Sequence, residues 1–301
     1  MRPVVVCLSD YPPELVRDWV SGTAEVVVAE RAAGWESVAP ALGRAQVVIA
    51  DAARRLVLDS DAIDRLECCR LIIVPAVGIE GSLDVVAARA RGLQVVNAPG
   101  YNADAVADWT VWAMLQALRE PEDLRRHGWR STPLGRELGA VRVGLLGYGA
   151  IGRAVHRRLA GFGTTVLHHT SRRGDDQGWV ELDELFAGCD IVSLHAPLTP
   201  DTAGLVGERL LALMPQDSAL INAARGAVVV EEDLVAALRA GRPARAVLDV
   251  FAVEPLPADS PLRTLDNVLL TPHIAAGTQQ ARGRVRTLVR THLREALGLA
   301  G

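Results

Sequence analysis

The most informative feature of this 301-residue sequence is a residue that it lacks: its 32 basic residues are all arginine, and it contains no lysine. Without lysine, the chain cannot use Schiff-base catalysis, the phosphate loop that depends on a lysine, or proton transfer by a Tyr–Lys pair. Cysteine is also scarce, with four residues and no CxxC spacing. We therefore expect reduced, mostly buried thiols, with no metal site and no disulfide framework.

Long apolar runs are absent as well. No stretch of 18 uncharged apolar residues occurs, and the N-terminal segment lacks the apolar core and the cleavage site of a signal peptide. The formal net charge of −4 gives no reason to expect nucleic acid or a membrane surface as a partner. These absences together predict a globular cytoplasmic protein.

Short β-branched runs alternate with helical patterns along the chain, which predicts an α/β fold built on parallel sheets. The predicted strands fall into two series: 3–9, 24–30, 45–51, 69–76 and 93–99, then 141–147, 164–170, 190–197, 218–224, 245–251 and 267–273. A longer segment, 101–140, separates the series and opens with a helical pattern. We predict two doubly wound domains with the active site in the cleft between them. A flavodoxin-like substrate domain comprises residues 1–99 and 276–301, and a Rossmann cofactor domain comprises 100–275.

The segment "VRVGLLGYGAIGR" places a GxGxxG pattern directly after a strand and at the start of a helix. Gly147 permits the tight turn, Gly149 lets a pyrophosphate approach the backbone, and Gly152 lets helix and strand pack closely. The helix N-terminus adds the N–H groups of Ala150 and Ile151 and a partial positive charge. The pattern alone is weak evidence, but in this strand–turn–helix context it predicts a dinucleotide site.

The following strand ends in "VLHHTSRR", which bears on the choice of dinucleotide. Thr170 stands where an NAD site usually carries an acid for the ribose hydroxyls, and Ser171, Arg172 and Arg173 follow it. A hydroxyl and two guanidiniums would hold a 2′-phosphate that an acid would repel, so NADP(H) is favoured over NAD(H). The alternative is a solvated turn whose arginines are incidental.

Polar groups at or beyond later strand ends suggest a catalytic site. Arg225 follows one strand, Asp249 lies in the next with Glu254 in the loop after it, and His273 follows the last. Separately they could be a surface arginine, capping acids and a packed histidine. Together they supply what reduction of a 2-keto acid needs. Histidine, with an ordinary pKa of about 6.5, transfers the proton, a carboxylate orients it, and arginine polarises the carbonyl.

These segments, with "HAPLTPDT", make residues 74–278 resemble the D-isomer-specific 2-hydroxyacid dehydrogenase family, and in particular its NADP-preferring glyoxylate/hydroxypyruvate reductase branch. The resemblance implies Arg225, Glu254 and His273 as catalytic residues, with Arg225 also binding substrate. It further implies that the backbone at Val77 and Gly78 binds the substrate carboxylate. The implied cofactor contacts beyond the glycine loop and the 170–173 turn are His195, Pro197, Thr202, Ala223, Asp249 and His273.

The resemblance also implies a homodimer, to which Trp109, Trp112 and Trp129 would contribute apolar area; the alternative is that they pack internally. The chain departs from the family pattern at Glu80 and Trp109, which leaves the identity of the 2-keto acid open. The rival interpretation is a catalytically idle, nucleotide-sensing protein of the same fold, similar to some corepressors. Consumption of NADPH with a 2-keto acid discriminates between the two.

Overall fold

The computed structural model describes residues 2–79, 81–119, 134–173 and 177–299, and these divide into two compact units. Unit 1 contains the chain up to Tyr101 and again from Gln279 onward, and unit 2 is the segment from Asn102 to Thr278. The chain therefore changes unit within three residues of both predicted boundaries. Glu80 and Trp129, which were singled out in the sequence, lie outside the described residues.

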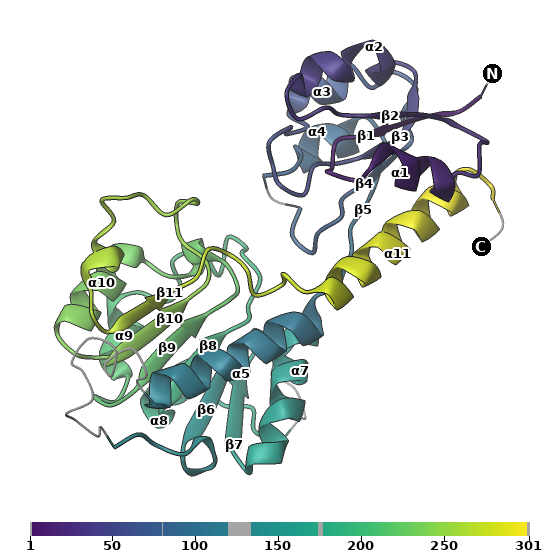
Figure 1. Cartoon of the computed structure of the whole chain (residues 1–301). Coiled ribbons are helices and arrows are strands. Elements are labelled where there is room, and N and C mark those ends of the chain that lie inside the picture. The colour runs from purple at the N-terminus through teal and green to yellow at the C-terminus, as the bar shows by residue number, and fades with distance from the viewer. Residues whose placement is uncertain (1, 80, 120–133, 174–176, 300–301) are drawn as a thin grey trace, which may run out of the picture. The chain divides into compact units, whose positions relative to one another are not determined.

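Unit 1 is a five-stranded parallel sheet with helices on both faces (Figure 1). Its strands are β1 (Val4–Cys7), β2 (Glu25–Val28), β3 (Ala45–Ile49), β4 (Leu71–Ile73) and β5 (Gln94–Val96). Its helices are α1 (Pro13–Trp19), η1 (Gly34–Ser37), α2 (Ala39–Leu42), α3 (Ser60–Asp64), α4 (Val85–Ala90) and α11 (Gln279–Ala296). The strand order β2-β1-β3-β4-β5 is the flavodoxin-like order.

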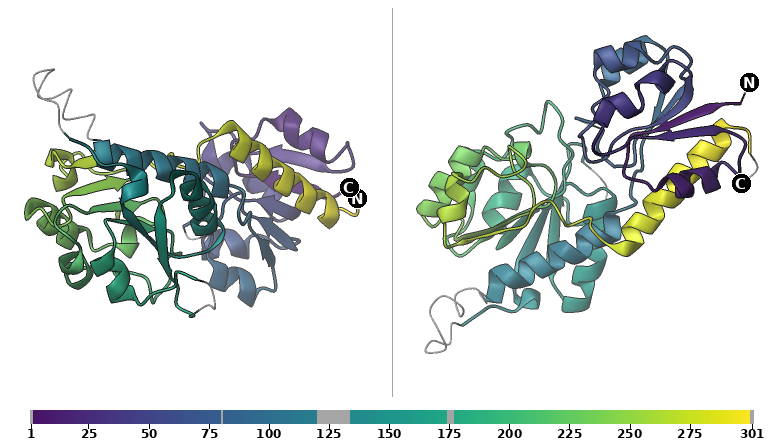
Figure 2. Two further views of the ribbon diagram at one scale, coloured as in Figure 1. Left: turned by 90° about the horizontal axis from the view of Figure 1, so that it is seen from below. Right: turned by 45° about the horizontal axis from the view of Figure 1, so that its top comes forward.

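Alternate residues of the unit 1 strands enter two different cores, because successive strand side chains point to opposite faces. Val4 and Val6 pack with residues of α2, α3 and α4, whereas Val5 and Cys7 pack with residues of α1 and α11. The right-hand view of Figure 2 shows α11 lying beside α1. The final helix, far away in the sequence, thus completes one face of this sheet.

Unit 2 is a six-stranded parallel sheet, again covered on both faces. Its strands are β6 (Arg142–Leu146), β7 (Thr165–His169), β8 (Ile191–Leu194), β9 (Ala219–Asn222), β10 (Arg245–Leu248) and β11 (Val268–Leu270). Its helices are α5 (Ala103–Arg119), η2 (Leu138–Ala140), α7 (Ala150–Leu159), η3 (Ala160–Phe162), α8 (Leu182–Gly188), α9 (Glu208–Leu213), η4 (Gly226–Val228), α10 (Glu231–Arg239) and η5 (Pro261–Thr264). Helices α5 and α7 share one core and α8, α9 and α10 the other.

The predicted fold class, with two doubly wound parallel sheets, is confirmed. In unit 2 the strand order is β11-β10-β9-β8-β6-β7, so the chain reverses direction across the sheet between β6 and β8. Such sheets bind ligands outside the carboxyl ends of their strands, at the point of reversal. The loops that leave β6 and β8 are therefore the first place to look for a site in this unit.

Candidate active site

The turn after β6 has the geometry that a dinucleotide pyrophosphate needs. Gly147 has a φ of +99°, and an added Cβ would lie 2.6 Å from the backbone nitrogen of Ala196. At Gly152 an added Cβ would collide with the carbonyl oxygen of Gly147. At Gly149, by contrast, it would meet no atom within 4 Å in the described chain outside the local backbone. Packing within the protein therefore requires glycine at positions 147 and 152, whereas Gly149 borders open space.

Helix α7 begins beside that open space. Gly149 is its N-cap and has no side chain with which to cap the helix. The first N–H groups, those of Ala150 and Ile151 among them, and the positive end of the ten-residue helix are therefore left for an anion. The residues present here fit a bound dinucleotide.

The turn after β7 lies next to the glycine loop, because the N–H of Gly147 donates to the carbonyl oxygen of His169 at 2.9 Å. Thr170 follows immediately, and its Oγ1 donates to the carbonyl oxygen of Arg172 at 2.7 Å. Ser171, Arg172 and Arg173 are exposed. No carboxylate in the described part of the chain pairs with either arginine. Two exposed arginines thus follow within four residues of His169, whose carbonyl contacts the dinucleotide loop.

The loop after β8 closes the other side of the point of reversal. The backbone of His195 would be in contact with any Cβ added at Gly147. The His195 ring places Nε2 3.0 Å from Oγ of Ser193, while its Nδ1 is buried and has no hydrogen-bond partner among the described residues. Burial lowers the pKa of His195 to about 4, because the charged ring would lose its hydration. This histidine is neutral at physiological pH.

Further along the same loop, Thr202 fixes the chain. Its Oγ1 donates to the carbonyl oxygen of Pro197 at 2.6 Å and accepts from the N–H of Thr199 at 2.8 Å. Pro197 and Thr202 are thus parts of one closed turn that follows His195.

His273 and Glu254 form the pair that the sequence predicts. His273 Nδ1 lies 2.7 Å from Oε2 of Glu254, and the other carboxylate oxygen accepts from the N–H of Phe251 at 3.1 Å. An ionised carboxylate can only accept, so Nδ1 carries a proton. His273 keeps 42% of its side chain exposed, and Nε2 has no hydrogen-bond partner in the described residues. Nε2 is therefore the nitrogen that can exchange a proton with a ligand.

Asp249 holds the turn that carries His273. It is 1% exposed, and its carboxylate accepts from Oγ1 of Thr271 at 2.6 Å and from the N–H groups of Ile274 and Ala275, both at 2.8 Å. This bracing accompanies a φ of +54° at His273, which non-glycine residues rarely adopt. Asp249 lies one residue beyond the end of β10, and not within the strand as predicted, because the ladder with β11 ends at Leu248 and the backbone of Asp249 instead accepts from the N–H of His273 in the turn after β11.

Arg225 lies in a turn after β9 that is braced by buried Asn222. The Asn222 side chain donates to the carbonyl oxygen of Arg225 at 3.1 Å and accepts from the N–H of Ala224 at 3.0 Å. Gly226 packs so closely on the backbone of residues 251–252 that no side chain would fit. The turn that carries Arg225 and the turn that carries Glu254 are therefore held in direct contact.

The predicted residues of unit 2 thus form two connected groups, both at the carboxyl edge of one sheet. The cofactor group joins the turns after β6, β7 and β8. The catalytic group joins the turns after β9, β10 and β11, and Ala223 packs in a small apolar cluster with Ala275. Within this unit, residues spread over more than a hundred positions converge because parallel strands end at a common edge.

In unit 1, the loop after β4 has the features of an anion-binding turn. Asn97 donates from Nδ2 to the carbonyl oxygen of Val77 at 2.6 Å, which fixes the loop. The N–H groups of Val77 and Gly78 donate to no other described residue. Two backbone donors are therefore available at the carboxyl end of a parallel strand.

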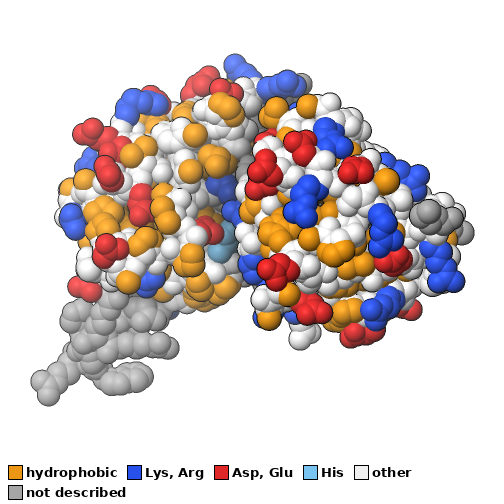
Figure 3. Space-filling view, turned by 90° about the horizontal axis from the view of Figure 1, so that it is seen from above, with side chains coloured by type: hydrophobic (Ala, Val, Ile, Leu, Met, Phe, Trp, Pro, Cys, Tyr) orange, Lys and Arg blue, Asp and Glu red, His pale blue; other side chains and the backbone are white. Residues whose placement is uncertain are grey.

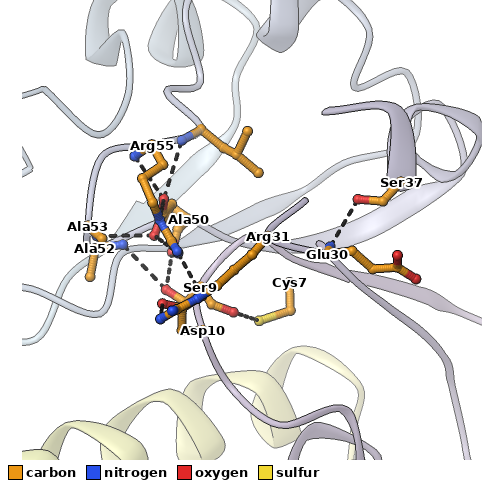
Figure 4. A network of polar contacts seen from close by, with 12 residues as sticks. Cys7, Ser9, Asp10, Glu30, Arg31, Ser37, Ala50, Ala52, Ala53 and Arg55 are labelled. Carbon is orange, nitrogen blue, oxygen red and sulfur yellow. Dashed lines mark hydrogen bonds and ion pairs between the residues drawn. The ribbon is translucent and has the colours of Figure 1, made fainter. Parts of the chain in front are cut away.

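A polar network shapes the neighbouring loop after β3 (Figure 4). The buried carboxylate of Asp51 accepts from the N–H groups of Ala53, Arg55 and Leu56 and from the Arg55 guanidinium. Arg55 also pairs with Asp10 at 2.8 Å. Hydrogen bonds from Arg31 and Arg55 lower the pKa of Asp10 to about 2. This network fixes the loop at the point of reversal in the unit 1 sheet, between β1 and β3.

Other classes of site find little support in the residues described. No group of three His, Cys, Asp or Glu side chains is arranged to hold a metal ion in this part of the chain. The helices found there are all too short or too polar to cross a bilayer. Figure 3 shows acidic and basic side chains interspersed over the face in view, without a large region of one sign.

Comparison with known proteins identifies the family of this chain. Residues 110–275 match the family profile described as "D-isomer specific 2-hydroxyacid dehydrogenase, NAD binding domain". The chain belongs to this family and is a nicotinamide-dependent D-2-hydroxyacid dehydrogenase. The predicted family and reaction class are confirmed.

Among its relatives is a glyoxylate reductase of Thermofilum pendens, which is 38% identical over 78% of this chain and 74% of that protein. Two solved structures show that the fold accommodates both dinucleotides. An acyclic imino acid reductase in complex with NADPH and D-Arg has a TM-score of 0.87 and 25% identity, covering 99% of this chain and 97% of the other. An NAD-dependent formate dehydrogenase from Staphylococcus aureus in complex with NAD has a TM-score of 0.82 and 26% identity, covering 97% and 95%.

Sequence reasoning missed several residues that organise the site. Thr271, which donates to Asp249, stands two residues before His273 in the sequence and could have been found there. Asn222 likewise stands three residues before Arg225, at the end of the same predicted strand. The N–H of Phe251 and the indole of Trp179, which packs against the turn after β7, gave no sequence signal, because their roles depend on the folded backbone.

Proposed function

We propose that this protein reduces a small 2-keto acid, such as glyoxylate or hydroxypyruvate, to the D-2-hydroxy acid with NADPH. The observation that carries the proposal is the His273–Glu254 pair at 2.7 Å, at the sheet edge that also bears the open glycine loop. The 38% identity to a glyoxylate reductase supports this choice of substrate.

A nicotinamide bound at this site would supply the hydride for the carbonyl carbon of the substrate. His273 donates the proton from Nε2 to the carbonyl oxygen, while Glu254 stabilises the imidazolium before transfer and fixes the ring through Nδ1. Arg225 polarises the carbonyl and binds the substrate carboxylate with its planar guanidinium. The carboxylate of Asp249 holds the turn that carries His273 by accepting hydrogen bonds from the N–H groups of Ile274 and Ala275.

We infer that the substrate carboxylate is also held by the N–H groups of Val77 and Gly78. Both groups lack an acceptor in the described structure, and consecutive backbone donors bind anions well. A proline at position 78 would remove one of them. We expect the Gly78→Pro variant to raise KM for the keto acid without changing the affinity for the dinucleotide.

The preference for NADP(H) is supported by the turn after β7. Thr170 stands where an acid would repel a 2′-phosphate, and two exposed arginines without a carboxylate partner in the described chain follow it. A 2′-phosphate would gain charge-assisted hydrogen bonds from these groups.

The test is the initial rate of NADPH oxidation, and separately of NADH oxidation, with glyoxylate, hydroxypyruvate, pyruvate and phenylpyruvate. A higher rate with NADPH than with NADH supports the proposed cofactor. Higher rates with glyoxylate and hydroxypyruvate than with pyruvate and phenylpyruvate support the proposed substrates. Activity with NADH alone would refute the 2′-phosphate interpretation and leave the reaction class intact. Tight dinucleotide binding without turnover of any acid would favour the nucleotide-sensing protein.

The cytoplasmic location stays a prediction.

We further propose that the protein is a homodimer that uses α5 in its interface. Trp109 packs with core residues of unit 2, whereas Trp112 is 39% exposed and lies 5.8 Å away, ring to ring. Of the two predicted contact residues that the structure describes, Trp112 is therefore the one that offers apolar area to a second copy.

A further inference from the structure

The aromatic side chain of Trp179 lies against the turn that would meet the 2′-phosphate. Residues 178–180 lie beside β7, the strand that ends just before this turn. There the N–H of His168 donates to the carbonyl oxygen of Gly178 at 2.8 Å, and the N–H of Val180 donates to that of His168 at 3.0 Å. Trp179 is the residue between these two bonds. Its backbone position is thus set by the sheet and not by the turn.

The indole of Trp179 makes three contacts with the turn and its base. Nε1 donates to the carbonyl oxygen of Thr170 at 3.4 Å, and the ring lies 5.7 Å from that of His169, centroid to centroid. The guanidinium carbon of Arg173 lies 5.3 Å from the indole centroid, over the ring. One side chain therefore holds both the first residue of the turn and its last described arginine.

This arrangement differs from an exposed arginine that is free to move. An arginine over an indole face is attracted to the ring, and its rotamers are restricted before any ligand arrives. The ring does not compete with a phosphate, because the in-plane N–H donors of a guanidinium remain available for hydrogen bonds. Arg172, the neighbouring arginine, has no such support in the described residues.

We propose that Trp179 is a positioning residue for cofactor selection: it orients Arg173 and the Thr170 backbone so that the turn recognises the 2′-phosphate of NADP(H). This inference rests on the proposed preference for NADP(H). Because NAD(H) has no 2′-phosphate, Trp179 contributes to the affinity for one dinucleotide and not for the other.

The experiment is a calorimetric measurement of Kd for NADP⁺ and for NAD⁺, with the wild type, Trp179→Leu, Trp179→Phe, Arg173→Ala and the Trp179→Leu/Arg173→Ala double variant. We expect Trp179→Leu to weaken NADP⁺ binding about five-fold, the size of an exposed cation–π contact, and to leave NAD⁺ binding unchanged. Trp179→Phe, which keeps an aromatic face, should restore most of the loss. In the Arg173→Ala background, Trp179→Leu should reduce NADP⁺ affinity little further, because the arginine that Trp179 orients is already absent.

Equal losses for both dinucleotides would overturn the proposal, since they would mean that Trp179 contacts the adenosine or supports the fold. Additive losses in the double variant would show that Trp179 does not act through Arg173. A wild type that binds NAD⁺ more tightly than NADP⁺ would instead refute the cofactor preference itself. Should Trp179→Leu fail to fold, Trp179→Met takes its place, alone and combined with Arg173→Ala. A loss of NADP⁺ affinity that disappears in the Arg173→Ala background is expected, and no loss, or the same loss in both backgrounds, refutes the proposal.

Discussion

At the scale of single residues, His273 is the group whose loss should separate catalysis from binding. Its Nε2 faces no hydrogen-bond partner in the described chain, so His273→Ala removes a proton donor without breaking a bond of the fold at that nitrogen. We expect turnover of the keto acid to fall by roughly 10²–10⁴-fold, the usual contribution of general acid catalysis. Steady-state kinetics and calorimetric NADPH binding together check this. A matched fall in NADPH affinity would contradict the assignment.

His195 provides a residue-scale prediction about pH. Its pKa is 6.5 ordinarily and about 4 in the fold, so below pH 6.5 the unfolded chain takes up a proton that the folded protein excludes. The free energy of unfolding should therefore fall as the pH drops from 6.5 towards 4, by up to about 1.4 kcal/mol per pH unit from this group. Urea unfolding of the wild type and of His195→Gln across this range measures it. The wild-type curve should fall more steeply, and parallel curves would refute the prediction.

At the scale of elements, the glycine loop offers a matched pair of substitutions. Gly147→Ala forces a Cβ onto the backbone of the loop after β8 at a φ of +99°, and should cost about 3 kcal/mol of stability. Gly149→Ala meets no described atom outside its local backbone and should leave the melting temperature unchanged, yet weaken dinucleotide binding roughly ten-fold, or about 1.4 kcal/mol. Thermal melts and calorimetry test both. Unchanged affinity in Gly149→Ala would place the pyrophosphate elsewhere.

The loop after β3 gives a second element-scale prediction. Asp51→Ala leaves three backbone N–H groups without their acceptor and leaves the Arg55 guanidinium with Asp10 alone, so we expect the free energy of unfolding to fall by about 2–3 kcal/mol. Asp10→Asn is the control, because that carboxyl is partly exposed and its ion pairs contribute only about 0–1 kcal/mol. Denaturant unfolding of the two variants compares them. Equal losses would mean that burial of Asp51 is not what matters.

The elements themselves were largely predictable from the sequence. Each of the eleven predicted runs contains one of the observed strands, but the strands are shorter because the runs continue beyond the ladder into the turns that carry polar groups. The start of the final helix at Gln279 is hard to predict from the sequence, because its first turn is polar and shows no apolar periodicity. Hydrophobic periodicity in a sequence indicates which residues are buried, so the exposed ends of helices and strands are not predicted by it.

The sequence predicts which residues form the candidate site better than it predicts the interactions that each of them makes. The His273–Glu254 contact was expected from the resemblance and is present. The bracing by Asp249, which fixes a left-handed His273, was not foreseen, because nothing in a one-dimensional pattern specifies which backbone groups a carboxylate will meet. The same holds for Trp179 and Arg173, whose contact depends on the chain returning beside β7.

At the scale of the whole molecule, we expect Trp112 to decide the state of association. If α5 pairs with a second copy, Trp112→Glu places a charge in an apolar interface and should shift the protein from dimer to monomer at micromolar concentration. Sedimentation velocity of both proteins measures the shift. A monomeric wild type would refute the dimer, and a dimeric variant would refute the role of this helix.

The division of the chain also determines the order in which the protein can form during synthesis. Unit 2 is one uninterrupted segment, so a ribosome releases all of it before helix α11 emerges. Unit 1 begins first and finishes later, because Val285, Val289 and Leu293 of α11 belong to its core. The nascent first hundred residues therefore wait with one sheet face covered only in part, by α1, while the inserted unit is made, and this interval is when a holdase chaperone has the most to bind.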